Sequence, residues 1–298
     1  MKANRKRLIG LIAVLTAAHI LHASYPGGIV REGLTIRSAI LNKKVRYTVY
    51  LPFDYETSSR WYPVVYLLHG YTDNDMGWIQ FGEAHLLADE AISERIIPPM
   101  ILIMPDGGVS FYINNYDGSV RYEDFFFEEF IPEMERIYRI RPEKRYRGIA
   151  GLSMGGYGAI LYALKHPDMF SACAAFSAAV TTPEDIVHMP DEFWDRSQGI
   201  LYGPDLADEE RLTPHFLSNN PVYLVRHADP VEFKDVRLYL DCGDDDFLSR
   251  GNAALHIALK EKGIRHEFRV RDGMHQWSYW RSGLVDGLKF IGTDFHQP

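Results

Sequence analysis

Hydrophobic and polar positions follow two patterns along this chain. Between residues 29 and 51 they alternate, as in "VRYTVYLP", which predicts antiparallel strands at the edge of a sheet. Later stretches with the length and composition of single strands are "YPVVYLLHG", "PPMILIMPDGG", "YRGIAGLS", "SACAAFSAA", "VRLYLDCG" and "HEFRVRDG". Helical patterns fall at about residues 83–95, 122–138, 154–165, 251–262 and 277–290. Strands that alternate with helices predict an α/β fold, with a mostly parallel central sheet and helices on both faces.

One stretch does not follow this alternation of strands and helices. From about residue 181 to residue 235 no strand pattern is evident, and prolines recur among scattered aromatic residues. Two interpretations stay open: an insertion over the carboxyl edge of the sheet, where ligands bind in open α/β folds, or an irregular excursion over the surface. Because the chain shows no low-complexity run and no internal repeat, we predict that residues 25–298 form one domain that includes this stretch.

The first 24 residues have the layout of a secretory signal peptide. Positive residues at positions 2, 5, 6 and 7 precede an apolar run over residues 8–21, and small residues follow at Ala23 and Ser24. The run is shorter than the roughly 20 residues that span a bilayer, so we expect membrane attachment only if the segment is not cleaved. The predicted location is the periplasm or the outside of the cell.

The charge balance argues against one class of partner. Lys and Arg number 32 against 40 Asp and Glu, so the formal net charge is −8, and it becomes −12 once the four positive residues of the signal segment are removed. Proteins that bind nucleic acid need a basic face, so we expect no nucleic-acid partner.

The chain has two cysteines, Cys173 and Cys242. They fall near opposite ends of two strands that we expect to be neighbours, which separates them by more than the ~7 Å between Cα atoms that a disulfide can bridge. We predict two buried free thiols.

A serine surrounded by glycines stands between a strand and a helix. In "YRGIAGLSMGGYGAILYAL", Gly151 and Gly155 flank Ser153 as G-x-S-x-G. A strand-to-helix turn this tight strains the backbone at the serine and brings neighbouring chain close, where side chains would obstruct. The hydroxyl is then exposed at the start of the helix, where unpaired N–H groups favour developing negative charge. Ser153 is the candidate nucleophile, and a helix N-cap serine with packing glycines is the alternative.

A serine hydroxyl needs a base to take its proton and an acid to orient the base. In hydrolases with this turn, the chain order is Ser, then Asp or Glu, then His. "LYLDCGDDDFL" ends one strand with several aspartates, and "FRVRDGMHQWSYW" ends the next with His275. We predict His275 as the base because it lies in the loop directly after the final strand.

The acid has to be chosen among neighbouring aspartates. Asp241 still belongs to the strand, whereas an apolar pair follows Asp246 and is expected to anchor it inward. Asp244 and Asp245 can stay solvated. We therefore predict Asp246 as the acid, with Asp245 as the second choice, and an acidic calcium-binding loop is the alternative.

Catalysis through a serine also needs N–H groups aimed at an oxyanion. "YLLHGYTDN" ends a buried strand at His69 and Gly70, and the loop that follows supplies one donor in enzymes of this kind; the residue after the nucleophile supplies the other. We expect the N–H groups of Tyr71 and Met154 to be these donors. His69 is interpreted as a side chain that orders the loop.

Together these stretches resemble a known family. "VYLP", "YPVVYLLHG", "ILIMPDGG", "GLSMGGYGA", "CGDDDFL" and the His-x-Trp-x-x-Trp stretch that starts at His275 are similar to the putative-esterase family of α/β-hydrolases, over about residues 34–290. That family includes feruloyl esterases, tributyrin-type carboxylesterases, S-formylglutathione hydrolases and mycolyl transferases. The resemblance implies the α/β-hydrolase fold, supports Ser153, Asp246 and His275 as the triad, and implies no metal or organic cofactor.

The expected activity is hydrolysis of small acyl esters, or of feruloyl or acetyl esters of carbohydrates. The signal segment argues against S-formylglutathione, a cytosolic substrate. Tyr112, Trp194 and Trp277 are expected to line an aromatic groove for a sugar-linked acyl group. An acyltransferase of the mycolyl-transferase type on the same triad and a non-catalytic binding relative stay open as alternatives. The sequence does not indicate an oligomeric state.

Overall fold

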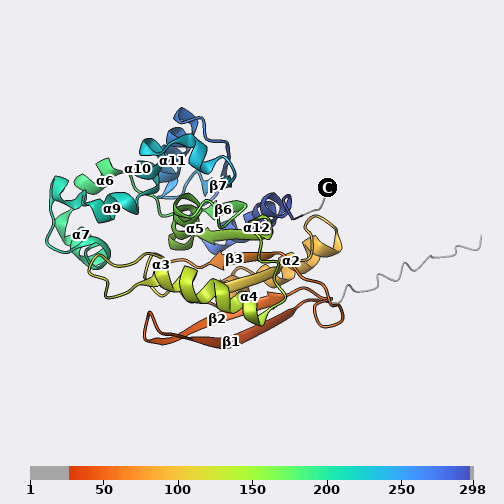
Figure 1. Cartoon of the computed structure of the whole chain (residues 1–298). Coiled ribbons are helices and arrows are strands. Elements are labelled where there is room, and N and C mark those ends of the chain that lie inside the picture. Colours follow the sequence, from red (N-terminus) through yellow and green to blue (C-terminus); the bar gives the residue numbers. More distant parts are fainter. Residues whose placement is uncertain (1–26, 296–298) are drawn as a thin grey trace, which may run out of the picture.

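The computed structural model describes residues 27–295, and one eight-stranded sheet lies at its centre (Figure 1). The strands lie in the order β1-β2-β4-β3-β5-β6-β7-β8. Their bounds are β1 (Ile29–Ser38), β2 (Lys43–Leu51), β3 (Val64–Leu68), β4 (Ile101–Pro105), β5 (Arg147–Leu152), β6 (Ala172–Phe176), β7 (Arg237–Gly243) and β8 (His266–Arg271). β2 pairs antiparallel with both β1 and β4, and all other neighbours are parallel. The predicted antiparallel edge and mostly parallel sheet are confirmed.

Helices cover both faces of the sheet. α5 (Met154–Lys165), α11 (Ser249–Glu261) and α4 (Ile131–Ile137) pack on one face, and α2 (Ala84–Ser93) and α12 (Trp277–Gly292) pack on the other. The short helix α1 (Gly77–Gln80) precedes α2. Strands β3, β5 and β6 are fully buried between these layers, which explains their apolar character. This is the α/β-hydrolase arrangement that the resemblance implies.

One predicted helix, over residues 122–138, is not a single α-helix. It consists of α3 (Tyr122–Asp124), a π-helix (Phe125–Phe130) and α4. Pro132 stands in the first turn of α4 and has no N–H to donate to a carbonyl four residues back. The change of register lies directly before it, and hydrophobic periodicity does not reveal such a change.

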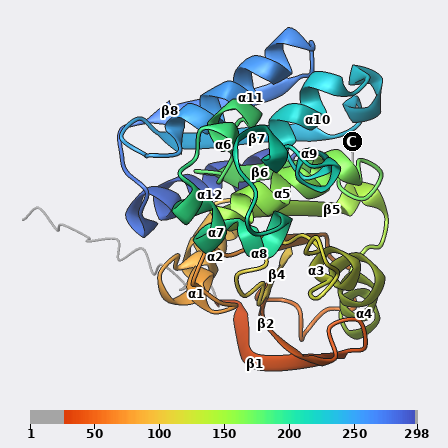
Figure 2. The same cartoon turned by 90° about the vertical axis from the view of Figure 1, so that its left-hand side faces the viewer.

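Residues 181–235 form a small helical layer. It contains the short helices α6 (Pro183–Val187), α7 (Asp191–Ser197), α8 (Gly199–Tyr202), α9 (Pro214–Ser218) and α10 (Pro221–His227). A separate apolar cluster joins Phe216 and Leu201 of this layer to Tyr157 of α5, and the fully buried guanidinium of Arg211 donates to main-chain carbonyls inside it. Because α5 begins at the carboxyl end of β5, the layer covers that edge of the sheet (Figure 2). The position of this layer corresponds to the first of the two interpretations.

The two cysteines lie where the strand pattern places them. Cys173 pairs with Leu238 near the start of β7, whereas Cys242 lies near the end of that strand. Both thiols are buried and free, as predicted. Burial raises the pKa of each thiol, that of Cys242 to about 12.

Between residues 27 and 295, none of the helices has the length and apolar character needed to cross a membrane. The segment predicted as a signal peptide, residues 1–24, lies outside the described residues.

Candidate active site

Ser153 lies in a sharp turn between β5 and α5. Its backbone has φ 52° and ψ −118°, a conformation that non-glycine residues rarely adopt. A Cβ at Gly151 would lie 2.3 Å from the carbonyl oxygen of Gly155, and a Cβ at Gly155 would lie 2.3 Å from that of Leu68. The flanking glycines therefore allow the ends of β3 and β5 and the first turn of α5 to meet at the serine, as the G-x-S-x-G spacing predicts.

His275 reaches Ser153 from the loop between β8 and α12. Its Nε2 lies 3.0 Å from the Oγ of Ser153, and its Nδ1 lies 2.9 Å from Oδ2 and 3.1 Å from Oδ1 of Asp246. A neutral imidazole protonated at Nδ1 satisfies both contacts, because Nδ1–H donates to the carboxylate and Nε2 accepts from the hydroxyl. The structure thus joins the three residues predicted as a triad in one hydrogen-bonded chain.

The buried carboxylate of Asp246 has partners besides the histidine. Its Oδ1 accepts from the N–H of Leu248 at 2.8 Å, and the hydroxyl of Ser177 also hydrogen-bonds to it. Burial on its own would raise the pKa of Asp246, but the hydrogen bonds with His275, Leu248 and Ser177 outweigh that effect and lower it. The carboxylate therefore stays ionised and can hold the imidazole in one orientation.

The apolar pair after Asp246 does not anchor it in the expected way. Phe247 is 76% exposed, and its ring packs on the imidazole of His275 with 4.5 Å between ring centroids. The N–H of Leu248, rather than burial of the phenyl ring, fixes the carboxylate. Phe247 is a site residue that the sequence analysis missed, because side-chain direction in a loop follows no periodicity.

Two backbone N–H groups beside Ser153 are available to an oxyanion. Those of Tyr71 and Met154 have no hydrogen-bond acceptor within the part of the chain that the structure describes. Met154 opens α5, where the first N–H groups lack an intrahelical partner, and Tyr71 lines the same pocket as Ser153. A Cβ at Gly70 would lie 2.7 Å from Cδ1 of Leu152 and 3.6 Å from Cβ of Ser153, so a larger residue there would press on the nucleophile turn. Both expected donors lie next to the nucleophile.

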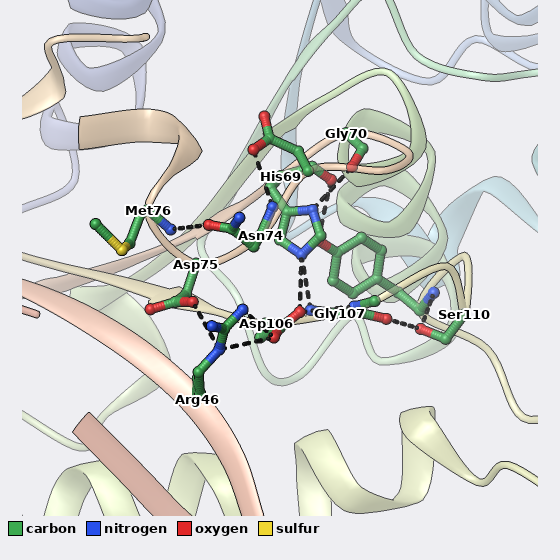
Figure 3. Close-up of polar contacts among 12 residues, drawn as sticks. Arg46, His69, Gly70, Asn74, Asp75, Met76, Asp106, Gly107 and Ser110 are labelled. Carbon is green, nitrogen blue, oxygen red and sulfur yellow. Dashed lines mark hydrogen bonds and ion pairs between the residues drawn. The ribbon is translucent and has the colours of Figure 1, made fainter. Parts of the chain in front are cut away.

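His69 orders the loop that carries Tyr71 (Figure 3). Its buried ring lies between two main-chain groups: Nδ1 is 2.8 Å from the carbonyl oxygen of Gly70, and the N–H of Gly107 donates to Nε2 at 2.8 Å. Both ring nitrogens are engaged, which agrees with the interpretation of His69 as a loop-ordering side chain.

A cluster of charged residues holds the far end of the same loop (Figure 3). The buried carboxylate of Asp75 accepts from the hydroxyl of Thr48 at 2.8 Å and lies 3.5 Å from Nε of Arg46, which also pairs with Asp106. Burial opposes ionisation of Asp106, but the imidazole of His69, a backbone N–H and Arg46 lower its pKa to about 2. The loop is thus fixed at both ends, which preorganises its middle at the pocket.

A pocket of about 620 Å³ opens over Ser153. The loop after β3 forms one wall, and the residues that follow His275 form another. Side chains that line it include Tyr71, Asp73, Phe81, Phe247, Gln276, Trp277 and Trp280. Trp277 thus lies where a substrate-contacting residue is expected, and aromatic rings dominate the walls.

Two residues expected in the substrate groove lie elsewhere. Tyr112 is fully buried, and its hydroxyl donates to the carbonyl oxygen of His69. Trp194 is fully buried inside the helical insertion, where its Nε1–H donates to the carbonyl oxygen of Gly203. Neither side chain can reach a substrate, so these two predictions are wrong. Both rings serve packing, which is the usual role of large aromatic residues.

Three exposed carboxylates, those of Asp244, Asp245 and Asp272, lie within 4.8 Å of one another and are the one group within residues 27–295 with metal-ligating spacing. The Oδ1 of Asp244 already accepts from the N–H groups of Asp245 and Gly273, which ties the loops after β7 and β8 together. Exposed acidic groups of this kind are common without an ion. Asp246 points away from them to His275.

Comparison with known proteins shows that the chain is similar to esterases. The chain matches the family described as "Putative esterase" over residues 38–291. An esterase of Mycobacterium tuberculosis H37Rv is 30% identical over 246 residues, which cover 76% of this chain and 51% of that protein. An acetyl esterase of Caldicellulosiruptor saccharolyticus is 26% identical over 85% of this chain and 95% of its own length.

A solved structure of a ferulic acid esterase superimposes with a TM-score of 0.77 and 34% identity, covering 91% of this chain and 99% of that one. The chain spans about half the length of the mycobacterial relatives that it matches. The family match covers most of the described residues and includes all three residues of the hydrogen-bonded chain. This protein therefore belongs to the "Putative esterase" family of α/β-hydrolases.

Proposed function

We propose that this protein is a serine carboxylic-ester hydrolase that works through an acyl-enzyme. The observation that carries the proposal is the chain from Ser153 Oγ through His275 to Asp246, with contacts of 3.0 and 2.9 Å. A histidine that accepts from a serine hydroxyl and donates to a buried carboxylate activates that hydroxyl as a nucleophile. The serine also faces a pocket in which an ester can bind.

In the first half-reaction, the Oγ of Ser153 attacks the ester carbonyl carbon while Nε2 of His275 takes the hydroxyl proton. The carbonyl electron pair moves onto oxygen, where the N–H groups of Tyr71 and Met154 stabilise the negative charge. When the tetrahedral intermediate collapses, the bond to the alcohol oxygen breaks, and Nε2 returns its proton to that oxygen. Asp246 keeps the imidazole oriented and stabilises its charged form.

In the second half-reaction, water attacks the acyl carbon and Nε2 of His275 takes its proton. The bond from the acyl carbon to Ser153 breaks, and Nε2 gives the proton back to Oγ. The carboxylic acid leaves and the enzyme returns to its starting state. Ester, water and these side chains supply every atom and proton of the cycle, so the proposed reaction needs no cofactor.

We propose a small acyl, acetyl or feruloyl ester of a carbohydrate as the substrate. Two of the similar proteins are named an acetyl esterase and a ferulic acid esterase, which supports this class. The N-terminal segment supports a location in the periplasm or outside the cell.

Acyl transfer to an alcohol is the alternative for the same triad. A transferase must exclude water from its acyl-enzyme or outcompete it. The rings of Tyr71 and Phe247, which line the pocket, are 52% and 76% exposed. Water therefore has ready access to Ser153, which favours hydrolysis.

Trapping the acyl-enzyme tests the proposal. The protein is mixed with p-nitrophenyl acetate, quenched in acid and digested, and the acetylated peptide is identified by mass spectrometry. We expect one acetyl group, on Ser153, and free acetate as the main product even when an alcohol acceptor such as methyl xyloside is present. An acetyl group on another residue, or acetylated acceptor as the main product, would refute hydrolysis through Ser153.

A further inference from the structure

The chemistry of the reaction determines which wall of the pocket faces the alcohol part of the ester. Nε2 of His275 must hand its proton to the leaving oxygen, so the alcohol has to lie beside the imidazole. Gln276 and Trp277 directly follow His275 and share one pocket with Asp73 on the loop after β3. Asp73 lies on the same side of the pocket, because its carboxylate packs against Gly77 of α1 and the ring of Trp277 packs against Trp78 of the same helix. These residues therefore face the alcohol, an assignment that rests on the proposed function.

Asp73 is the one carboxylate among the residues that line this pocket. Its Oδ1 accepts from the N–H of Asn74 at 2.9 Å, whereas its Oδ2 has no hydrogen-bond donor within residues 27–295. Partial burial raises the pKa of the Asp73 carboxyl, and the Asn74 N–H and the His69 ring oppose that rise. A carboxylate oxygen that is partly withdrawn from water gains from a donor, and a substrate hydroxyl would supply one.

The backbone holds this carboxylate in place. The N–H of Asp73 donates to the carbonyl oxygen of Gly70 at 3.2 Å, which closes a turn where Thr72 has φ 63°. A β-branched residue rarely adopts that conformation. A Cβ at Gly77 would lie 2.4 Å from both carboxylate oxygens of Asp73, so this carboxylate packs directly against the backbone of Gly77. The strained turn and the glycine together keep Asp73 at the pocket wall.

Aromatic rings stand beside the carboxylate. The ring of Trp277 packs on that of Phe81 with 5.8 Å between centroids, and edge-on against Trp78 at 5.3 Å. Phe81 and Tyr71 are about half exposed. Flat aromatic faces suit the C–H side of a sugar ring, and a carboxylate suits its hydroxyl groups. The negative charge disfavours an acidic alcohol.

We propose that Asp73 is a specificity-determining residue that accepts a hydrogen bond from a hydroxyl group of the alcohol part of the substrate. The rings of Trp277 and Phe81 stack against the carbon face of the same group. The preferred substrates are then esters of neutral sugars that carry a free hydroxyl near the ester. Asp73 binds the alcohol and takes no part in proton transfer.

The test compares wild type, Asp73→Asn and Asp245→Asn on two esters with the same acyl group, p-nitrophenyl acetate and methyl xyloside monoacetate. Asparagine keeps the Oδ1 acceptor for the N–H of Asn74, so the loop is retained, but it removes the charge and turns Oδ2 into a donor. Asp245→Asn removes an exposed charge outside the pocket and serves as the matched control.

We expect Asp73→Asn to lower kcat/KM for the sugar ester by about tenfold or more, mainly through KM, and to change that for p-nitrophenyl acetate by less than about twofold. Asp245→Asn should change neither. Equal losses on both esters, or no loss on either, would overturn the proposal. Failure of the hydrolase assignment is recognised separately, because Ser153→Ala would then keep wild-type rates on p-nitrophenyl acetate.

Discussion

The Oγ of Ser153 lies 3.0 Å from Nε2 of His275, although 122 positions separate the two residues in the chain. Ser153 follows β5 and His275 lies in the loop after β8, and both strands end at the same edge of the sheet with β6 and β7 between them. The contact therefore depends on the strand order of the sheet and on the backbone of the two turns that follow β5 and β8. Substitutions that disturb this contact, or the groups that support it, should change activity or stability in defined ways.

Asp246→Asn tests whether the carboxylate orients the histidine. Asparagine keeps the size of the side chain but lets the imidazole carry its proton on Nε2, which then cannot accept from Ser153. We expect kcat for p-nitrophenyl acetate to fall by about 10⁴-fold while the circular dichroism spectrum stays unchanged. Asp245→Asn is the control, and comparable losses in both variants would contradict the role assigned to Asp246.

Asp106 should make stability depend on pH in the acid range. Burial opposes its ionisation, but His69, the N–H of Gly108 and Arg46 lower its pKa from 3.8 to about 2. Because the pKa is depressed in the folded protein, this stabilisation is complete above the ordinary pKa and is lost as the pH falls from about 4 towards 2.

The urea midpoints of wild type and Asp106→Asn measure this effect. We expect wild type to have the higher midpoint at about pH 6, and the difference to shrink by about pH 3. A difference that stays constant over this range would show that the carboxylate charge is not the cause.

Gly155→Ala tests the close approach at the nucleophile turn. The new Cβ would lie 2.3 Å from the carbonyl oxygen of Leu68, a contact that only a backbone shift can relieve. We expect the free energy of unfolding to fall by about 1–3 kcal/mol and activity to fall with it, as measured by urea unfolding and ester hydrolysis. Gly199→Ala, whose Cβ would lie 3.3 Å from Pro204, is a matched helical control with a smaller expected cost. Similar costs for both variants would argue against a tight turn.

Phe247→Ala removes a ring that packs on the catalytic imidazole without belonging to the core. The two ring centroids are 4.5 Å apart, and Phe247 is 76% exposed. Because the ring packs on the imidazole and lines the pocket, we expect kcat/KM to fall by about fivefold, which corresponds to about 1 kcal/mol of transition-state stabilisation. The thermal midpoint should hardly change, since exposed substitutions usually alter stability by less than about 0.5 kcal/mol. A large drop in the midpoint with unchanged kcat/KM would show a purely structural role.

Much of the fold and the hydrogen-bonded chain can be predicted because their signals are local. Apolar runs mark the strands, the glycines around Ser153 mark a turn that few other residues allow, and His275 follows the last strand directly. Parallel strands bring their carboxyl ends to one edge, so the order of these residues along the chain was enough to bring them together.

The remaining features depend on packing that no local pattern records. Tyr112 and Trp194 are aromatic residues of the kind expected in a sugar-binding groove, yet both side chains are fully buried. Residue type alone does not determine whether a side chain in a loop or an insertion faces the solvent or a core. Phe247 was expected to help anchor Asp246 inward, but its side chain is exposed. The place of Asp73 in the pocket depends on Thr72 adopting a left-handed backbone, for which the sequence carries no marker.

The most direct measurement is the initial rate of p-nitrophenyl acetate hydrolysis by wild type and by Ser153→Ala, with the fold of both checked by circular dichroism. We predict steady turnover by wild type and a loss on the order of 10⁶-fold in the variant. Turnover that persists in Ser153→Ala, or a wild type that cleaves no acetyl, butyryl or feruloyl ester, would contradict the assignment of this protein as a serine ester hydrolase.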